Sequence, residues 1–175
     1  MNLLSFFLHK PQPTNGIRMP RTKAGTIFEI ACLMLNILLW IMAAWMWSKL
    51  PDTVPTHFDA SGHPNQYSGK AFGLIFPCAI CAFVSILIML SVYLPSKNIS
   101  GTQITNITQM VWVARGLRII GVLMPLLFMS IFGVIGCETL GWPAPLHLVT
   151  ATLTGAIVLI PLLFIILALF KGKRA

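Results

Sequence analysis

Residues 24–48 decide the fold: they read AGTIFEIACLMLNILLWIMAAWMWS, and Glu29 is their only charged residue. A helix needs about 20 mostly apolar residues to cross the hydrocarbon core of a membrane. Comparable apolar blocks lie at residues 71–94, 105–136 and 146–170. The sequence therefore predicts an all-α integral membrane protein with four transmembrane helices. Residues 24–175 would form a single transmembrane domain, preceded by a cytoplasmic tail, residues 1–23, that holds a short interfacial segment.

The composition excludes several classes of protein. The chain of 175 residues is 57% hydrophobic and only 9% charged, whereas soluble domains are about 45–50% apolar and about 25% charged. The mean hydropathy is +0.84. These values exclude a cytosolic enzyme and a disordered tail. The net charge of +8 does not indicate a nucleic-acid partner, because the placement of the basic residues has a simpler explanation.

That explanation is membrane topology. Ten of the twelve basic residues fall in the two terminal segments, in the connection at residues 95–108, or at the start of the third helix. Only Lys49 and Lys70 lie in the connection between the first two helices. The positive-inside rule then predicts that both termini are cytoplasmic and that residues 49–70 are extracytoplasmic. The expected partner along the helices is the lipid bilayer.

One face of the first helix carries polar residues. Glu29, Cys32 and Asn36 are spaced by three and four positions, so they share one side of a helix. An ionisable group in a membrane helix normally faces the bundle interior and a partner. We predict that Glu29 forms an intramembrane ion pair with Arg115 or Arg118 of the third helix. A structural pair is favoured over a proton or ion pathway.

Prolines interrupt three of the predicted helices, namely the second, third and fourth. They are Pro77, Pro125 and Pro161. A proline inside a membrane helix bends it and frees a carbonyl, which neighbouring helices then satisfy.

The connection between the first two helices is the informative segment. Residues 49–70 have no helical or strand periodicity, and a connection of this length is usually functional or disordered. Its prolines and glycines alternate with aromatic and β-branched residues, which favours tight turns. We therefore expect an ordered extracytoplasmic cap loop.

This loop resembles a known signature. The pattern L-P-D-x-x-P-T-H-F at residues 50–58, followed by Gly62, Pro64, Tyr67, Ser68 and Lys70, is similar to the loop of SdpI-type membrane proteins, which carry domain of unknown function 1648. The resemblance implies a bacterial or archaeal inner-membrane protein, and we expect the bacterial inner (cytoplasmic) membrane. The best-known member of that family confers immunity to a secreted toxic peptide and relieves a transcriptional repressor by holding it at the membrane, and the resemblance implies a role of this kind.

On this interpretation the cap recognises a peptide or a lipid-borne ligand. The residues expected to form the recognition surface are Pro51, Asp52, Pro55, His57, Phe58, Asp59, Gly62, Tyr67 and Lys70.

Two alternatives stay open. His57, Asp59 and His63 are chemically suitable zinc ligands, and Glu138, expected in the short connection at residues 136–145, and His147 would reach the same side. A small zinc-dependent membrane enzyme would follow, although the pattern matches no established zinc signature and we assign no catalytic residue. The other alternative is an accessory subunit of a membrane complex or transporter that docks a partner protein through Glu29, Ala151 and Gly155.

Overall fold

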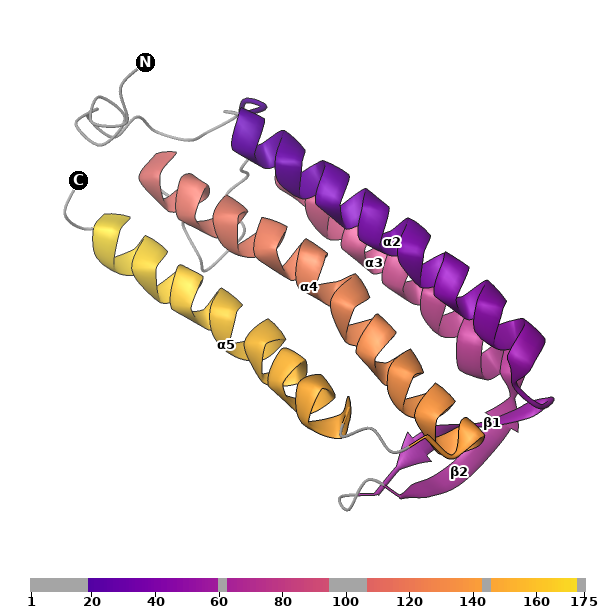
Figure 1. Ribbon diagram of the computed structural model, residues 1–175. Coiled ribbons are helices and arrows are strands. Elements are labelled where there is room, and N and C mark those ends of the chain that lie inside the picture. Colours follow the sequence, from indigo (N-terminus) through magenta and orange to yellow (C-terminus); the bar gives the residue numbers. More distant parts are fainter. Residues whose placement is uncertain (1–18, 60–62, 95–106, 143–145, 173–175) are drawn as a thin grey trace.

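The computed structural model describes residues 19–59, 63–94, 107–142 and 146–172 (Figure 1). Its long helices are α2 (Lys23–Lys49), α3 (Phe76–Ser91), α4 (Ile107–Leu140) and α5 (Leu146–Gly172). A short π-helical turn, η1 (Ala71–Ile75), runs directly into α3. The described residues contain four helical spans that are long and apolar enough to cross a membrane. These spans indicate a multi-pass membrane protein.

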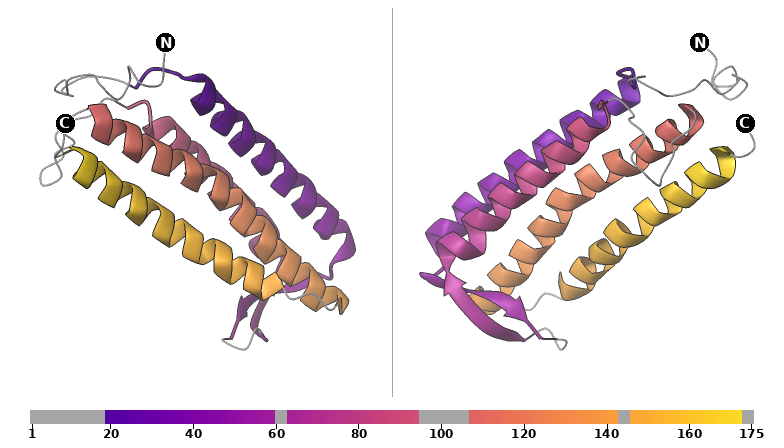
Figure 2. Two further views of the ribbon diagram at one scale, coloured as in Figure 1. Left: turned by 60° about the vertical axis from the view of Figure 1, so that its left-hand side comes forward. Right: turned by 180° about the vertical axis from the view of Figure 1, so that it is seen from behind.

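Helix α4 occupies the centre of the bundle. It packs against α2, α3 and α5, whereas α5 packs mainly on α4 and lies on the far side from α2 and α3 (Figures 1 and 2). Two strands, β1 (Thr53–Phe58) and β2 (Pro64–Gly69), lie at one end of the bundle, which we call the hairpin end. The opposite end, where α2 begins and α5 finishes, we call the charged end.

Helix α2 has clear start and stop signals. Thr22 is its N-cap, and the Thr22 hydroxyl accepts a hydrogen bond of 3.0 Å from the backbone N–H of Gly25. At the other end Leu50 adopts an extended conformation, which is the conformation that a following proline, here Pro51, favours. The chain therefore leaves the helix where the hairpin begins.

Helix α4 extends further than the sequence predicted. Gly141 has a φ of +68°, and the N–H of Trp142 donates to the carbonyl of Cys137 at 2.9 Å. This is the glycine-dependent termination of a Schellman motif. The prediction that the helix ends near residue 136 is wrong, and Glu138 lies in the last turn of α4 rather than in the connection.

The three prolines differ in position. Pro77 lies in the first turn of α3, where the missing N–H costs little, and it follows η1 directly. Pro125 and Pro161 lie inside α4 and α5. Since Pro125 has no N–H, the Gly121 carbonyl lacks its helical donor. The thiol of Cys32 on α2 donates to that carbonyl at 3.2 Å, so a neighbouring helix satisfies the freed group.

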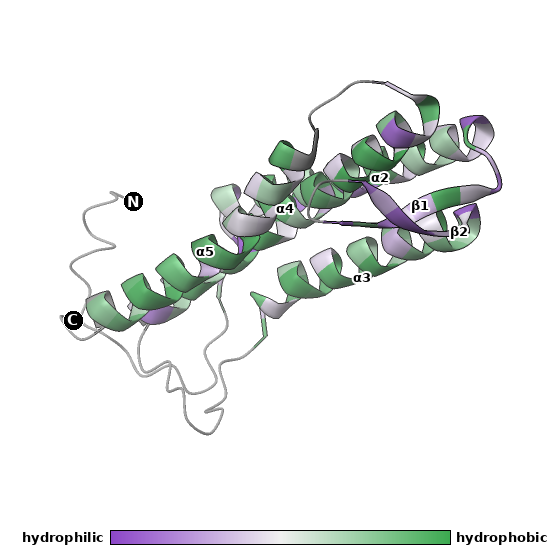
Figure 3. Cartoon of the chain, turned by 90° about the horizontal axis from the view of Figure 1, so that it is seen from below, coloured by the Kyte–Doolittle hydropathy of each residue, from purple (hydrophilic) through white to green (hydrophobic). Residues whose placement is uncertain are grey.

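The hydrophobic core is concentrated toward the hairpin end. Its fully buried side chains come from α2, β1, η1, α3 and α4, and include Leu39, Val54, Leu74 and Phe132. Large apolar side chains on the outer faces of the helices are exposed, as expected for surfaces that face lipid. Figure 3 shows the helices mostly in the hydrophobic colour, while the strands carry much of the hydrophilic colour.

Residues 53–69 contain an antiparallel β-hairpin, where the sequence predicted a loop without strands. In the register Val54 pairs with Ser68, and Pro55 pairs with Tyr67. The register shifts on both sides of His57, which is typical of a β-bulge. The connection is therefore a short twisted ribbon seated across the end of the bundle.

Candidate functional site

The hairpin is held to the bundle by its inward-facing side chains. Val54 is completely buried, and its Cγ2 methyl lies so close to Gly73 of η1 that a Cβ at residue 73 would collide with it. Phe58 packs against the core as a partly buried side chain, and Pro55 is buried in β1. Burial of a valine side chain contributes about 1.5–3 kcal/mol, so these contacts fix the position of the ribbon.

Lys70 links the end of β2 to the start of the connection. Its Nζ lies 3.1 Å from the carboxylate of Asp52, and its backbone N–H donates to the Asp52 carbonyl at 2.8 Å. The same Nζ lies 5.0 Å from the centroid of the Trp47 ring and 3.5 Å from the Trp47 carbonyl oxygen. The Lys70 side chain is only 20% exposed, whereas Asp52 is 97% exposed. Lys70 therefore closes the base of the hairpin over the end of α2, beside the exposed Pro51.

The outward side of the hairpin is polar and aromatic. His57 Nδ1 lies 2.5 Å from the side-chain oxygen of Asn65. Since an amide oxygen only accepts hydrogen bonds, Nδ1 is the donor, and a neutral His57 ring keeps Nε2 as its acceptor. Tyr67 is 59% exposed. Gln66, which lies between Asn65 and Tyr67 in β2, is exposed as well. This surface offers hydrogen-bonding groups and one aromatic ring to a ligand.

Asp59 organises the tip of the hairpin. Its carboxylate accepts a hydrogen bond of 2.9 Å from the backbone N–H of His63, and its own N–H donates to the His63 carbonyl at 2.9 Å. The His63 ring nitrogen lies 4.0 Å from the same carboxylate. Both side chains are exposed. Gly62, which the sequence placed in the recognition surface, lies outside the described residues.

The residues proposed as zinc ligands do not converge in the described part of the chain. No group of three His, Cys, Asp or Glu side chains among those residues is arranged to hold a metal ion. His57 pairs with Asn65, and Asp59 is engaged by His63. The His147 side chain lies outside the described part, and Glu138 is exposed on α4. The described residues therefore show no zinc centre among themselves, and the zinc hypothesis, which includes His147, stays a prediction.

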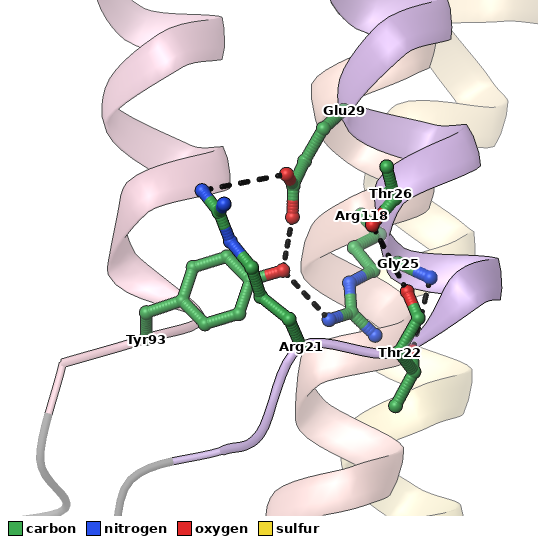
Figure 4. Close-up of polar contacts among 7 residues, drawn as sticks. All are labelled: Arg21, Thr22, Gly25, Thr26, Glu29, Tyr93 and Arg118. Carbon is green, nitrogen blue, oxygen red and sulfur yellow. Dashed lines mark hydrogen bonds and ion pairs between the residues drawn. The ribbon is translucent and has the colours of Figure 1, made fainter.

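A second group of polar residues lies at the charged end (Figure 4). The Tyr93 hydroxyl donates a short hydrogen bond to the Glu29 carboxylate. In turn, Nη2 of Arg118 donates to the Tyr93 oxygen at 3.3 Å. Arg21 approaches Glu29 with a nitrogen–oxygen distance of 3.9 Å. Tyr93 thus connects Glu29 of α2 with Arg118 of α4.

This arrangement differs from the expected ion pair in two respects. No direct contact within ion-pair distance joins Glu29 to Arg115 or Arg118 among the described residues, because the phenol of Tyr93 lies between Glu29 and Arg118. Arg115 is exposed, and its guanidinium lies 4.9 Å from the centroid of the Trp112 ring. Tyr93 was not among the residues that the sequence predicted to take part, although a lone tyrosine at the end of an apolar block is a signal for such a role.

Further along α2, Asn36 makes a buried interhelical contact. Its side-chain nitrogen donates to the hydroxyl of Ser85 on α3 at 3.0 Å and to the Cys32 carbonyl at 2.9 Å. Asn36 is 4% exposed and Ser85 is fully buried. The polar face predicted for α2 therefore meets α3 and α4, and its hydrogen bonds are made inside the bundle, as polar groups between membrane helices require.

Comparisons with known proteins place these features in a family context. Residues 34–82 match the family model described as "Domain of unknown function (DUF1648)". The match runs from Met34 in α2 through the hairpin to Ala82 in α3. It includes His57, Tyr67 and Lys70, but not Glu29, Tyr93 or Arg118.

A protein of similar length is known from the archaeon Archaeoglobus fulgidus. This "Uncharacterized protein" is 29% identical over 167 residues, which cover 86% of the present chain and 82% of the archaeal one. No solved structure matches the chain significantly. The chain is therefore similar to proteins with a DUF1648 domain, and the matched segment carries the hairpin.

Proposed function

We propose that this chain is a binding protein of the cytoplasmic membrane, rather than an enzyme, and that its hairpin recognises a peptide or a lipid-borne ligand. In this proposal both termini are cytoplasmic and the hairpin faces outward. Recognition would protect the cell from a membrane-active peptide or signal its presence, as the resemblance to SdpI-type proteins implies.

One observation carries the proposal: the hairpin is fixed on one side and open on the other. Buried Val54 and nearly buried Lys70 hold the ribbon in place. Tyr67 and His57 stay exposed on it. A ligand that binds such a preorganised surface loses less free energy to ordering of the protein than one that must first order a mobile loop. Exposed tyrosines are also frequent anchors of binding surfaces.

The proposal predicts a change in the tolerance of cells to peptides. Expression in a sensitive bacterial host should shift the killing curve of at least one peptide in a panel of secreted membrane-active peptides to higher concentration. Tyr67→Ala should remove most of that shift, because it deletes the exposed ring of the hairpin. The measurement is the peptide concentration that halves survival, at matched membrane levels of protein.

Phe83→Ala is the matched control. Phe83 is 69% exposed on α3, so this variant also deletes an exposed ring, but one that faces lipid and lies outside the hairpin. It should keep the protection. Identical killing curves with and without the protein across the panel would contradict a protective role. Equal losses in the two variants would contradict recognition by the hairpin.

A further inference from the structure

The two strands of the hairpin differ in how far they are covered. β1 carries the buried residues Val54 and Pro55, whereas none of the residues of β2 is buried. Tyr67 is 59% exposed, and Gly69 is exposed as well. Since glycine has no side chain, the exposed surface of Gly69 is backbone. β2 therefore presents main-chain groups to its surroundings at the hairpin end (Figure 1).

The register determines which backbone groups of β2 point away from β1. The N–H of Lys70 donates to the Asp52 carbonyl at 2.8 Å, so these two residues occupy a hydrogen-bonded position of the ladder. Opposed residues of antiparallel strands alternate between hydrogen-bonded and non-hydrogen-bonded pairs. The next pair, Thr53 with Gly69, is therefore not hydrogen-bonded. The N–H and C=O groups of Gly69 point to the outer edge of β2.

Tyr67 occupies the equivalent position two residues earlier in β2. It pairs with Pro55, and a proline has no N–H to donate, which suits a pair without hydrogen bonds. The N–H and C=O groups of Tyr67 thus point outward as well. In the described part of the chain, no backbone hydrogen bond beyond the ladder involves residues 64–69. The outer edge of β2 therefore has unpaired donors and acceptors on both Tyr67 and Gly69.

The other edge of the hairpin is blocked. Pro55 takes an outward position on β1, where it offers no N–H, and it is buried. Proline is one of the residues with which proteins prevent the pairing of an edge strand with another chain. β1 also packs against α4 and η1. The hairpin thus has one blocked edge and one open edge, and the open edge carries the exposed ring of Tyr67.

We propose that β2 binds by strand addition: an extended peptide segment pairs with Tyr67 and Gly69 and adds a strand to the two-stranded sheet. This binding mode depends on the proposed function of the hairpin and specifies the chemistry of its ligand. Main-chain hydrogen bonds supply the affinity of such complexes, and alternate side chains of the peptide supply the specificity. An aromatic or β-branched side chain beside Tyr67 is favoured, because such cross-strand pairs stabilise neighbouring strands. A lipid headgroup has no matching series of donors and acceptors.

A proline at residue 69 tests the open edge. Gly69→Pro removes an N–H that the hairpin itself does not use, and the nearest atom to a Cβ there is the Asp52 carbonyl oxygen at 4.0 Å. The probe is the panel peptide whose killing curve the wild type shifts most. Gly69→Pro should lose most of that shift. Thr53→Pro is the matched control, because it removes an outward N–H from the opposite edge, and it should keep the protection.

Hydrogen exchange gives a second test that needs no variant. The purified full chain in detergent is mixed with the same peptide until about 90% of the protein is bound. NMR should then show about tenfold slower exchange of the Tyr67 and Gly69 amides, because only the free fraction exchanges. A panel peptide against which the protein gives no protection should leave both amides unchanged.

The possible outcomes separate this binding mode from the proposed function. Loss of protection in Tyr67→Ala but not in Gly69→Pro would overturn strand addition and leave recognition by side chains. Unchanged exchange of both amides in the peptide complex would overturn it as well. Equal losses in Gly69→Pro and Thr53→Pro would indicate a damaged hairpin, and the exchange measurement then decides. A disulfide-linked dimer of Gln66→Cys without peptide would assign the edge to a second copy of the chain. If the wild type shifts no killing curve, the proposed function fails, and strand addition of a toxic peptide fails with it.

Discussion

Arg118 carries a permanent charge in a helix that is otherwise suited to lipid. The free-energy cost of burying this charge is lowered locally, because Nη2 of Arg118 donates to Tyr93 and Tyr93 donates to Glu29. The phenol thus transmits the attraction between two charges that do not touch directly. Such hydrogen bonds between membrane helices contribute about 0.6 kcal/mol on average and up to about 2 kcal/mol, and a charged partner places this one toward the upper value.

Tyr93→Phe tests that role. The variant keeps the ring but deletes the hydroxyl, so Glu29 and Arg118 each lose a hydrogen-bond partner. We expect a loss of about 1–2 kcal/mol in the free energy of unfolding, measured by thermal or denaturant unfolding in detergent. Tyr67→Phe deletes the hydroxyl of a 59% exposed tyrosine and should leave the stability unchanged. Equal stability of both variants would mean that the Tyr93 hydroxyl is dispensable.

For single residues, the sequence predicted which polar side chains of α2 face the bundle interior better than it predicted their partners. The spacing of Glu29, Cys32 and Asn36 indicated a shared inward face, and the side chains of Cys32 and Asn36 are buried. The predicted direct pairing of Glu29 with an arginine is prevented by a third side chain. This is Tyr93, in the turn after α3, which lies between Glu29 and Arg118. Spacing along one helix contains no information on such a long-range insertion, so the one available signal for Tyr93 was its position at the end of an apolar block.

Among the elements, helices and strands differed in how strongly the sequence signals them. Each transmembrane helix rests on about 20 apolar residues, which is a long and redundant signal. The strands are six residues each. β1 contains Pro55, and β2 reads PNQYSG, a composition typical of turns. Their pairing is stabilised by tertiary contacts of Val54 and Lys70, which no local pattern reveals. The end of α4 could have been predicted from Gly141, since glycine is the usual residue there.

The seat of the hairpin on η1 should tolerate no added volume. Gly73→Ala places a Cβ against the buried Val54 methyl, and neither the β-branched side chain nor the backbone can yield freely. We expect a loss of about 1–3 kcal/mol, the usual cost of overpacking a core, and faster proteolysis of the hairpin in limited digestion. Gly155→Ala on α5 is the control, because a Cβ there meets nothing within 4 Å.

The two glycine variants distinguish a seated hairpin from a loosely attached one. Alanine is favoured over glycine inside helices by about 1 kcal/mol, so Gly155→Ala should be neutral or slightly stabilising. If Gly73→Ala behaved in the same way, the hairpin would not be clamped against η1. The rigid surface on which the proposed ligand recognition depends would then be absent.

For the whole molecule, the distribution of charge predicts its orientation. Both ends of the described chain lie at the charged end of the bundle, and the hairpin lies at the other. In the sequence, ten of the twelve basic residues fall in the two terminal segments, in the connection at residues 95–108, or at the start of the third predicted helix. Since basic residues near membrane helices are retained in the cytoplasm, we expect the charged end inside and the hairpin outside. This orientation would also expose the hairpin to secreted peptides.

Reporter fusions in a bacterial host test this orientation directly. Green fluorescent protein fused after Ala175 should fluoresce, and alkaline phosphatase fused at the same position should be inactive, because each folds to its active form on one side only. Truncation after Trp142 removes α5 and one crossing, so both readouts should reverse. An active phosphatase after Ala175 would place the charged end outside. The hairpin would then face the cytoplasm, where a secreted peptide could not reach it before crossing the membrane, and the proposed protective role would be excluded.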